Sequence, residues 1–266
     1  MELNKTSAAL NVAMAAAREA GNQIIQAITQ IDRVKVTQKD RHELVSETDV
    51  LVEQIIIEEL DKAYPEFNIL GEESGLVDRN SEFTWIIDPI DGTHNFLHSH
   101  PHCGISIALK HNDDIVAAVI YDAIRNELFS ARKGAGAQLD GRRIRVSNVS
   151  KLADSLLVTG YPSRHTEDTK PWLKSFALVL PRAQTIHNTG SSVLDLAYVA
   201  CGRYDGLWQY GLKQWDIAAG SLLIKEAGGL ISDISGNVDV FKTGNLIAGN
   251  PKVFEKLSVL VTHNHK

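Results

Sequence analysis

The sequence predicts a mixed α and β protein, and three patterns support that prediction. Apolar residues recur at helical spacing in 7–31 and again in 48–63. Short apolar runs in 103–139 alternate with turn signals, as in an antiparallel meander. Strand-like and helix-like segments alternate in 156–251, which is typical of an α/β unit with a partly parallel sheet.

The pattern changes between Asn148 and Leu152, and we place a boundary there. An N-terminal α+β subdomain, 1–150, would carry the antiparallel sheet and most of the acidic side chains discussed below. A C-terminal α/β subdomain, 151–266, would complete the functional site. A chain of 266 residues is long enough for one large domain or two modest ones.

The first helix is Ala-rich, with Ser7 as a plausible N-cap, and its small residues suggest close packing against another helix. The polar segment 37–43 is expected to be a mobile loop. A second helix should open at Thr48 and turn Leu51, Ile55, Ile56 and Leu60 inward. Tyr64-Pro65 should end it.

In the C-terminal half the pattern predicts alternating elements. We expect strands at 156–159, 183–187, 205–210, 230–232 and 246–248, with helices at 171–180, 191–201 and 215–227 and a last one from Pro251. Gly228-Gly229 suits a helix C-terminus because glycine adopts the left-handed conformation readily.

The stretch from Trp85 to Thr93 is the most informative part of the chain. Trp85-Ile86-Ile87 reads as a strand with both faces buried. Pro89 cannot donate to a ladder, so the strand should end near Asp88. Asp88 and Asp91 would then lie close together on a sharp turn, where two carboxylates repel unless a cation or proton lies between them. The ordinary alternative is a solvated turn with Asp91 as a helix cap.

Two further segments also present acids at the ends of predicted elements. Glu72-Glu73 follows a short strand, and Asp216 lies at a predicted helix start. Each has an ordinary interpretation alone, as a charged loop or an N-cap. Together with Asp88 and Asp91 they suggest an all-oxygen cluster, which favours magnesium or manganese over zinc or copper. A pair of such ions is a familiar device for phosphoryl chemistry.

Other features narrow the function classes. The net charge of −6 argues against a nucleic-acid surface as the main purpose. Two distant cysteines give no disulfide framework and suit a reducing cytoplasm, and no apolar run reaches membrane-spanning length. His94, His98, His100 and His102 match no standard zinc spacing, so we expect surface histidines near an entrance. Without a glycine-rich nucleotide loop, ester hydrolysis is favoured over transfer from ATP.

The acidic segments carry a resemblance to a known family. Gly71-Glu72-Glu73-Ser74, the run from Trp85 to Thr93, and Trp215 to Gly220 with Glu226 to Gly229 resemble the inositol monophosphatase family, most closely its bacterial inositol-1-monophosphatase branch. The resemblance covers nearly the whole chain. It implies a layered α/β/α/β/α sandwich, a homodimer, a requirement for Mg²⁺ and inhibition by lithium.

The resemblance also implies residue roles. Glu72, Asp88 and the backbone carbonyl of Ile90 would hold one Mg²⁺, and Asp88, Asp91 and Asp216 would hold a second.

Catalytic roles follow in the same way. Glu72 and Thr93 would position the attacking water, with Asp49 hydrogen-bonded to Thr93, and Lys39 matches a lysine in a mobile loop near the metals. The residues expected to contact the substrate are Asp91, Gly92, Thr93, His187, Gly190, Ser191, Ser192, Gln209 and Asp216.

The sequence departs from the family pattern at four positions. His94 replaces a common Thr, and Glu43 stands where Asp is usual. His187 lies where bacterial members often carry Arg, and Gln209 lies where inositol-specific members carry a Glu that accepts hydrogen bonds from sugar hydroxyls. A Gln still accepts such a bond but has no charge. The catalytic class is therefore better supported than the identity of the alcohol.

Three hypotheses follow. The leading one is a Mg²⁺-dependent phosphomonoesterase that acts on inositol 1-phosphate or a related small polyol or sugar phosphate. A second is a mainly non-enzymatic partner of the transcription antitermination machinery, which the resemblance to bacterial members raises. A third is a sister phosphatase activity on fructose 1,6-bisphosphate or histidinol phosphate, or on a nucleotide bisphosphate, for which no adenine-binding feature is evident.

Overall fold

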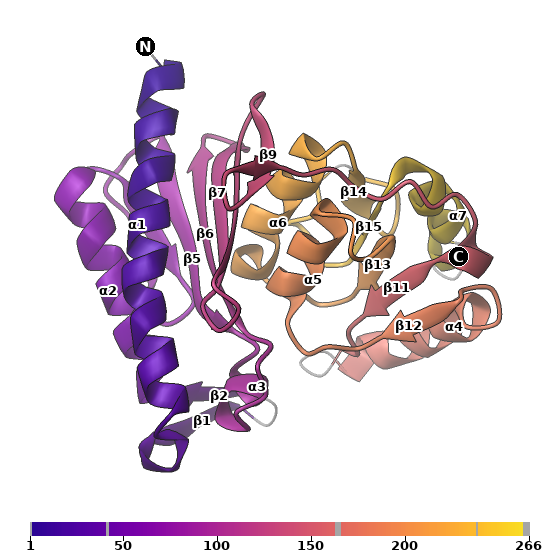
Figure 1. The fold of residues 1–266 in the computed structure, drawn as a ribbon, viewed down its shortest axis with the longest axis horizontal. Coiled ribbons are helices and arrows are strands. Elements are labelled where there is room, and N and C mark those ends of the chain that lie inside the picture. Colours follow the sequence, from indigo (N-terminus) through magenta and orange to yellow (C-terminus); the bar gives the residue numbers. More distant parts are fainter. Residues whose placement is uncertain (1, 41–42, 163–165, 238, 263–266) are drawn as a thin grey trace.

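Two β-sheets face each other across a pair of helices, and further helices cover the outer face of each sheet (Figure 1). The structure is a computed structural model that describes residues 2–40, 43–162, 166–237 and 239–262. The layers follow one another as helix, sheet, helix, sheet, helix. This is the α/β/α/β/α sandwich that the resemblance implied.

The first sheet has eight strands in the order β10-β9-β8-β7-β6-β5-β3-β4. Its members are β3 (Asn68–Gly71), β4 (Gly75–Val77), β5 (Phe83–Asp91), β6 (Gly104–His111), β7 (Asp114–Asp122), β8 (Glu127–Arg132), β9 (Gly136–Leu139) and β10 (Arg142–Arg143). The neighbours β3 and β5 run parallel, and the predicted meander from β6 to β9 is antiparallel.

The second sheet has five strands in the order β12-β11-β13-β15-β14. Its members are β11 (Leu156–Thr159), β12 (Thr185–His187), β13 (Gly206–Gln209), β14 (Leu230–Asp233) and β15 (Leu246–Gly249). The three strands β12, β11 and β13 are parallel, whereas β13, β15 and β14 pair antiparallel. The predicted partly parallel sheet is confirmed.

Each helix layer buries one apolar face of a sheet. The long helices α1 (Glu2–Ile28) and α2 (Glu47–Ala63) cover the first sheet, α5 (Ser192–Ala200) and α6 (Gln214–Glu226) lie between the sheets, and α4 (Thr169–Val179) and α7 (Pro251–Thr262) cover the second. Short elements complete the chain: α3 (Thr93–Leu97) and the 3₁₀ turns Ile31–Arg33, Leu152–Asp154 and Thr166–Asp168.

The alternation of side chains along the strands sets up these layers. In β5, Trp85 and Ile87 pack toward α1 and α2, whereas Ile86 packs toward α5 and α6. Both faces of the strand are therefore buried, as its continuous apolar run predicts. In β13, Leu207 and Trp208 divide in the same way between the two faces of the second sheet.

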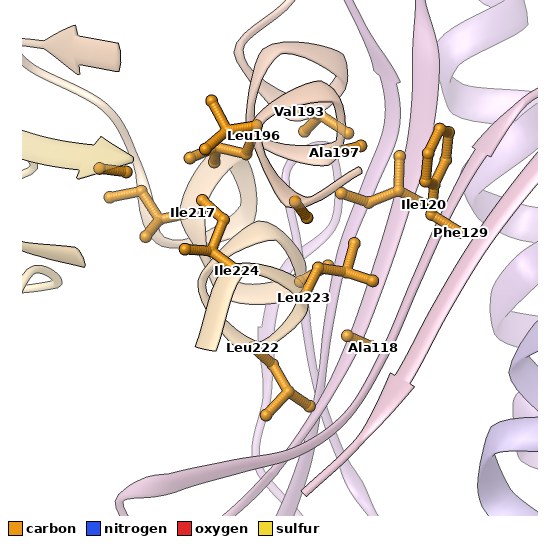
Figure 2. Close-up of a cluster of buried hydrophobic side chains, with 14 of the residues drawn as sticks. Ala118, Ile120, Phe129, Val193, Leu196, Ala197, Ile217, Leu222, Leu223 and Ile224 are labelled. Carbon is orange, nitrogen blue, oxygen red and sulfur yellow. The ribbon is translucent and has the colours of Figure 1, made fainter. Parts of the chain in front are cut away.

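The middle layer joins the two sheets through one hydrophobic cluster (Figure 2). Val193 and Ala197 of α5 and Leu223 of α6 share this cluster with Ile120 and Phe129 of the first sheet. Gly220 of α6 lies so close to α5 that a Cβ atom there would be 2.5 Å from Leu196 Cβ. The backbone of α6 therefore packs directly against a side chain of α5.

A bulge in β5 corrects the prediction that this strand ends near Asp88. The strand continues to Asp91, and its pairing with β6 runs Asp88↔Ser106 and then Asp91↔Gly104. Pro89 and Ile90 thus oppose the single residue Ile105, and the missing N–H of Pro89 falls where the ladder is already interrupted. Residues three apart normally face opposite sides of a sheet, but the extra residue brings Asp88 and Asp91 to the same side.

The N-terminal segments differ from their predictions. Ser7 is not a cap, because α1 begins at Glu2. The polar segment 37–43 contributes to a two-stranded hairpin of β1 (Val36–Asp40) and β2 (Glu43–Ser46), a pairing that shows no apolar alternation; residues 41 and 42 lie outside the described residues. Ser46 rather than Thr48 caps α2, and Leu51 is exposed while Ile56 and Leu60 are buried.

The C-terminal elements lie within a few residues of the predicted ranges. The chain passes from the first sheet to the second between β10 and β11, but α5 and α6 of the second half pack on the first sheet, so the division at residue 150 stays a prediction. Among the described residues, no helix is both long and apolar enough to cross a membrane.

The contact at Gly220 generates a stability prediction. Gly220→Ala should lower the free energy of unfolding by about 1–2 kcal/mol, because overpacking against Leu196 outweighs the gain in helix propensity of about 1 kcal/mol. Urea unfolding followed by circular dichroism measures this change. The matched control is Lys225→Ala on the exposed side of α6, which should change stability by less than about 0.5 kcal/mol. A Gly220→Ala protein as stable as the parent would contradict the packing argument.

Candidate active site

A cavity of about 510 Å³ opens at the ends of β3, β5 and β13 and the starts of α3, α5 and α6. A volume of this size suits a small organic ligand. Its lining includes nearly every residue that the sequence analysis singled out: Glu72, Asp88, Ile90, Asp91, Gly92, Thr93, Gly190, Ser191, Ser192, Gln209 and Asp216. Side chains that are far apart in the sequence therefore meet in one place.

Three carboxylates form the floor of this cavity. Asp88, Asp91 and Asp216 each offer an oxygen, and these oxygens lie within 4.8 Å of one another. Asp88 is 1% exposed and Asp216 3% exposed. Burial, reinforced by the charges of Glu72, Asp91 and Asp216, raises the pKa of Asp88 well above its ordinary value.

Glu72 reaches the cluster because β3 and β5 are parallel neighbours whose carboxyl ends meet. Gly71 pairs with Ile87, and the Glu72 backbone N–H donates to the Ile87 carbonyl over 3.1 Å, one residue before Asp88. Glu53 of α2 anchors the following turn, since its buried carboxylate accepts from the backbone N–H groups of Glu73, at 2.9 Å, and Ser74, at 2.7 Å. These two hydrogen bonds from α2 thus fix the turn that carries Glu72.

Asp91 is fixed by the first residues of α5. Its carboxylate accepts from Ser191 Oγ at 2.6 Å, from Ser192 Oγ at 3.2 Å and from the Val193 backbone N–H at 2.8 Å. Unpaired N–H groups at a helix start favour a negative charge. These bonds attach the end of β5 to the helix that links the two sheets.

Asp216 is the third residue of α6, and its Oδ2 accepts from the Lys213 backbone N–H at 2.8 Å. It therefore contributes to capping, as the ordinary interpretation held, and also belongs to the acidic cluster. Ser106, which is paired with Asp88 across β5 and β6, donates to the Trp215 carbonyl at 3.1 Å. This bond sets the start of α6 beside β5.

Asp49 and Thr93 are also in contact. Thr93 Oγ1 lies 3.2 Å from Asp49 Oδ1 and 3.1 Å from the Ile90 carbonyl, so its single hydroxyl proton has two acceptors within reach. Asp49 is 1% exposed, and burial raises its pKa despite hydrogen bonds from Ser46 and Thr93 that lower it.

Main-chain atoms form the region between Asp91 and α5. Gly92, with φ of +88°, is the N-cap of α3, and a Cβ atom there would meet the carbonyls of His102 at 3.0 Å and Gly190 at 3.2 Å. Asn95 holds these segments together, because its Nδ2 donates to the His102 carbonyl at 2.7 Å and to the Thr189 carbonyl at 2.8 Å. Only glycine fits this left-handed, crowded position.

The remaining wall is formed by Gln209 at the end of β13. Gln209 is 4% exposed, and its Nε2 donates to Asp195 Oδ2 at 3.3 Å. His187 does not join it: its exposed ring packs edge-on against Tyr204, and the residue is not among those that line the cavity. The structure describes the backbone of Lys39 in β1 but not its side chain, so the expectation for this residue stays a prediction.

The acidic floor fits a divalent cation. Asp88 Oδ1 is buried and has no hydrogen-bond partner among the described residues, although such an atom normally finds one. The possible metal ligands around it are carboxylate oxygens, which Mg²⁺ and Mn²⁺ prefer. A cation between these groups would remove their mutual repulsion.

The histidine cluster is no part of this arrangement. His94, His98 and His100 are exposed as expected, and His94 borders the cavity, but His102 is 6% exposed, which corrects the expectation for that residue. Its backbone carbonyl accepts from Asn95, and its ring packs edge-on against Tyr198. Within the described ranges, the group of side chains placed to hold a metal contains no histidine.

Three supporting residues escaped the sequence analysis: Glu53, Asn95 and Asp195. A polar residue on an apolar helix face was the available signal for Glu53, which is 2% exposed, and for Asp195, which interrupts the apolar run Val193 to Ala200. Asn95 gave no such signal, because its two acceptors lie in separate segments.

Comparison with known proteins decides the family. A profile described as "Inositol monophosphatase family" matches residues 5–265. The chain belongs to the inositol monophosphatase family. Membership of this family supports phosphatase activity.

Individual members of the family are similar over nearly their whole length. The protein named Nus factor SuhB from Pseudomonas aeruginosa is 44% identical over 253 residues, which cover 93% of each chain. The extragenic suppressor protein suhB from Bartonella henselae has a solved structure with a TM-score of 0.93 and 41% identity, covering 96% of this chain and 98% of that one. The inositol monophosphatase from Anabaena (Nostoc) sp. PCC 7120 has a TM-score of 0.85 and 33% identity, covering 99% and 97%.

His102 beside this site generates a prediction on pH. Burial, followed by the charges of Arg125 and His100, lowers the pKa of His102 to about 4. In the unfolded chain His102 takes up a proton near pH 6.5, whereas in the folded chain it does so only near pH 4. The free energy of unfolding should therefore fall as the pH falls through this window. Between pH 7 and 4.5, the parent should lose about 2 kcal/mol more unfolding free energy than His102→Leu. Urea titrations at each pH measure the difference.

His98→Leu is the matched control, because the His98 ring is exposed. This variant should follow the parent at every pH. Parallel curves for the parent and His102→Leu would show that His102 is not held neutral.

Proposed function

We propose that this protein is a Mg²⁺-dependent phosphomonoesterase that hydrolyses inositol 1-phosphate or a related small polyol or sugar phosphate. The observation that supports it best is the convergence of Asp88, Asp91 and Asp216 beside Glu72 and the Asp49–Thr93 contact at one cavity. Such a cluster of oxygen ligands suits metal-assisted attack of water on a phosphate ester.

In this proposal, Glu72, Asp88 and the carbonyl of Ile90 hold one magnesium ion, and Asp88, Asp91 and Asp216 hold a second. When bound, such ions would supply neutralisation of phosphate charge and a more acidic water molecule. This agrees with the raised pKa of Asp88, which results first from burial and then from the charges of Glu72, Asp91 and Asp216.

The remaining steps belong to the side chains and backbone of the chain. Thr93 Oγ1, whose proton points toward Asp49 and the Ile90 carbonyl, keeps a lone pair that can accept a hydrogen bond from the attacking water. Glu72 accepts from the same water and orients it toward phosphorus. The backbone N–H groups of Gly92 and Thr93 donate to the phosphate oxygens.

The alcohol part of the substrate would lie toward Gly190, Ser191, Ser192 and Gln209. His187 lies outside this cavity, and we leave it out of the proposed contacts. Homodimer formation, lithium inhibition and a cytoplasmic location belong to the same proposal, as properties that the family resemblance implies.

A phosphate-release assay tests the proposal. The purified protein should release phosphate from inositol 1-phosphate or from another small ester in a panel that includes glycerol 2-phosphate and fructose 1,6-bisphosphate, and release should require Mg²⁺. Asp88→Asn should lower kcat/KM by more than about 100-fold, because ligand loss exceeds the 10–100-fold effect typical of groups that only support ligands. Exposed Asp113→Asn is the matched control and should retain activity. Phosphate release that is independent of Mg²⁺ and of Asp88 would end the proposal.

A second candidate function is association with the transcription machinery. It is favoured by the similarity to proteins named Nus factor SuhB, of which one is 44% identical over 93% of this chain. Such binding would use the outer surface and would not need the acidic floor. The two functions are therefore separable by mutation.

A binding experiment distinguishes the candidates. Immobilised parent protein and Asp88→Asn should both retain RNA polymerase and Nus factors from the same bacterium if this function holds, because Asp88 is only 1% exposed. Retention by neither protein at physiological salt would exclude the second candidate.

A further inference from the structure

The side-chain amide of Gln209 has a hydrogen-bond partner at its nitrogen but none, among the described residues, at its oxygen. Its Nε2 donates to Asp195 Oδ2 at 3.3 Å, whereas Oε1 is buried with no hydrogen-bond partner among the described residues. Gln209 lines the cavity at the end of β13. A buried carbonyl oxygen without a donor is destabilising, so the orientation of this amide needs a cause.

Asp195 provides that cause. It lies on α5, is 1% exposed, and accepts from Thr189 Oγ1 at 2.7 Å as well as from Gln209. Thr189 occupies Oδ1, so Oδ2 is the oxygen left to accept from Gln209, and an accepting carboxyl oxygen must face the NH₂ group of the amide and not its carbonyl oxygen. Burial raises the pKa of Asp195 well above its ordinary value and the charge of Asp91 adds to the rise, whereas the hydrogen bonds from Thr189 and Gln209 offset part of it.

The space beside the same NH₂ group is bounded by a glycine. A Cβ atom at Gly160 would lie 3.0 Å from Gln209 Nε2, so the absence of a side chain at this position leaves room for the NH₂ group. Thr189 is the first residue of the segment Thr189-Gly190-Ser191, and its backbone carbonyl accepts from Asn95 Nδ2. The amide is thus held between two elements that also shape the cavity.

We propose that Asp195 is a positioning residue, which fixes the Gln209 amide with its carbonyl oxygen as the acceptor for the substrate. The preference for a hydroxylated alcohol, which the family resemblance already implies for the position of Gln209, would then depend on Asp195. The second statement rests on the proposed phosphatase function, whereas the first does not.

The selection follows from hydrogen-bond inventory. A hydroxyl of the alcohol can donate to Gln209 Oε1 and satisfy an atom that otherwise stays buried and unpaired. An alkyl group cannot, and an ether or carboxylate oxygen would meet a lone pair. Sites built to pair a substrate hydroxyl discriminate strongly against analogues that lack it.

Matched pairs of esters isolate this effect. Inositol 1-phosphate and cyclohexyl phosphate share a ring but differ in hydroxyls, and glycerol 2-phosphate and isopropyl phosphate share a three-carbon skeleton. The parent protein with Mg²⁺ should favour the hydroxylated member of a pair in kcat/KM. Asp195→Asn should lower that preference about tenfold, mainly through a higher KM for the hydroxylated ester.

The direction of this change has a structural reason. The carbonyl of the new asparagine would keep the bond from Thr189, so its NH₂ group would face Gln209. The Gln209 amide would then turn over and present NH₂ to the substrate in place of Oε1. Gln209→Leu should reduce the preference to a similar extent, and the double variant should show no further loss, because Asp195 acts through Gln209.

Asp205→Asn is the matched control. Asp205 is also buried and accepts from the Leu156 backbone N–H at 2.7 Å, but it does not line the cavity. This variant should leave the ester preference unchanged even if it unfolds more easily. An unchanged preference in Asp195→Asn, or additive losses in the double variant, would overturn the positioning role.

A second measurement does not depend on activity. The side-chain amide resonances of Gln209, identified by their loss in Gln209→Leu, should include a proton shifted downfield by the bond to Asp195, and Asp195→Asn should remove that shift. Identical shifts in both proteins would overturn the positioning role. Phosphate release from neither member of either pair would instead reject the proposed function, and the amide resonances would still decide the role of Asp195.

Discussion

Repulsion between the buried carboxylates is the interaction on which the site depends. Oxygens of Asp88, Asp91 and Asp216 lie within 4.8 Å of one another, where each pair of charges at an effective dielectric constant of 20 repels by about 3 kcal/mol. A chain would not assemble this cluster unless the surrounding fold held it. The bulge in β5, the hydrogen bonds from the start of α5 and the bond from Ser106 to the start of α6 provide that support.

The supporting contacts also explain why the site lies where the first sheet meets the middle helix layer. Asp88 and Asp91 belong to the first sheet, whereas Asp216 and the groups that bind Asp91 start the helices of the middle layer. The hydrophobic cluster shared by Ile120, Phe129, Val193 and Leu223 fixes those helices against the first sheet (Figure 2). Packing at a distance from the cavity therefore sets the distances between the acids.

The sequence predicted the acids but not the geometry that unites them. Trp85 to Ile87 and the acids around them follow from apolar runs and charge, which are local signals. The bulge does not, because the missing N–H of Pro89 fits a strand end as well as an interrupted ladder. Strand β1 is polar from Thr37 to Asp40 and so resembled a loop, although β2 contributes Leu44 and Val45. The partners of Glu53, Asn95 and Asp195 are visible only after folding.

Main-chain atoms shape one part of the cavity and side chains shape another. Around Gly92 the chain backs onto the carbonyls of His102 and Gly190, so main-chain atoms shape this region and no side chain can enter without displacing them. The facing wall consists of side chains such as Gln209 and Tyr161. Evolution can exchange these side chains freely while the main-chain region around Gly92 stays constant. New substrate ranges can therefore arise in this scaffold without redesign of its chemistry.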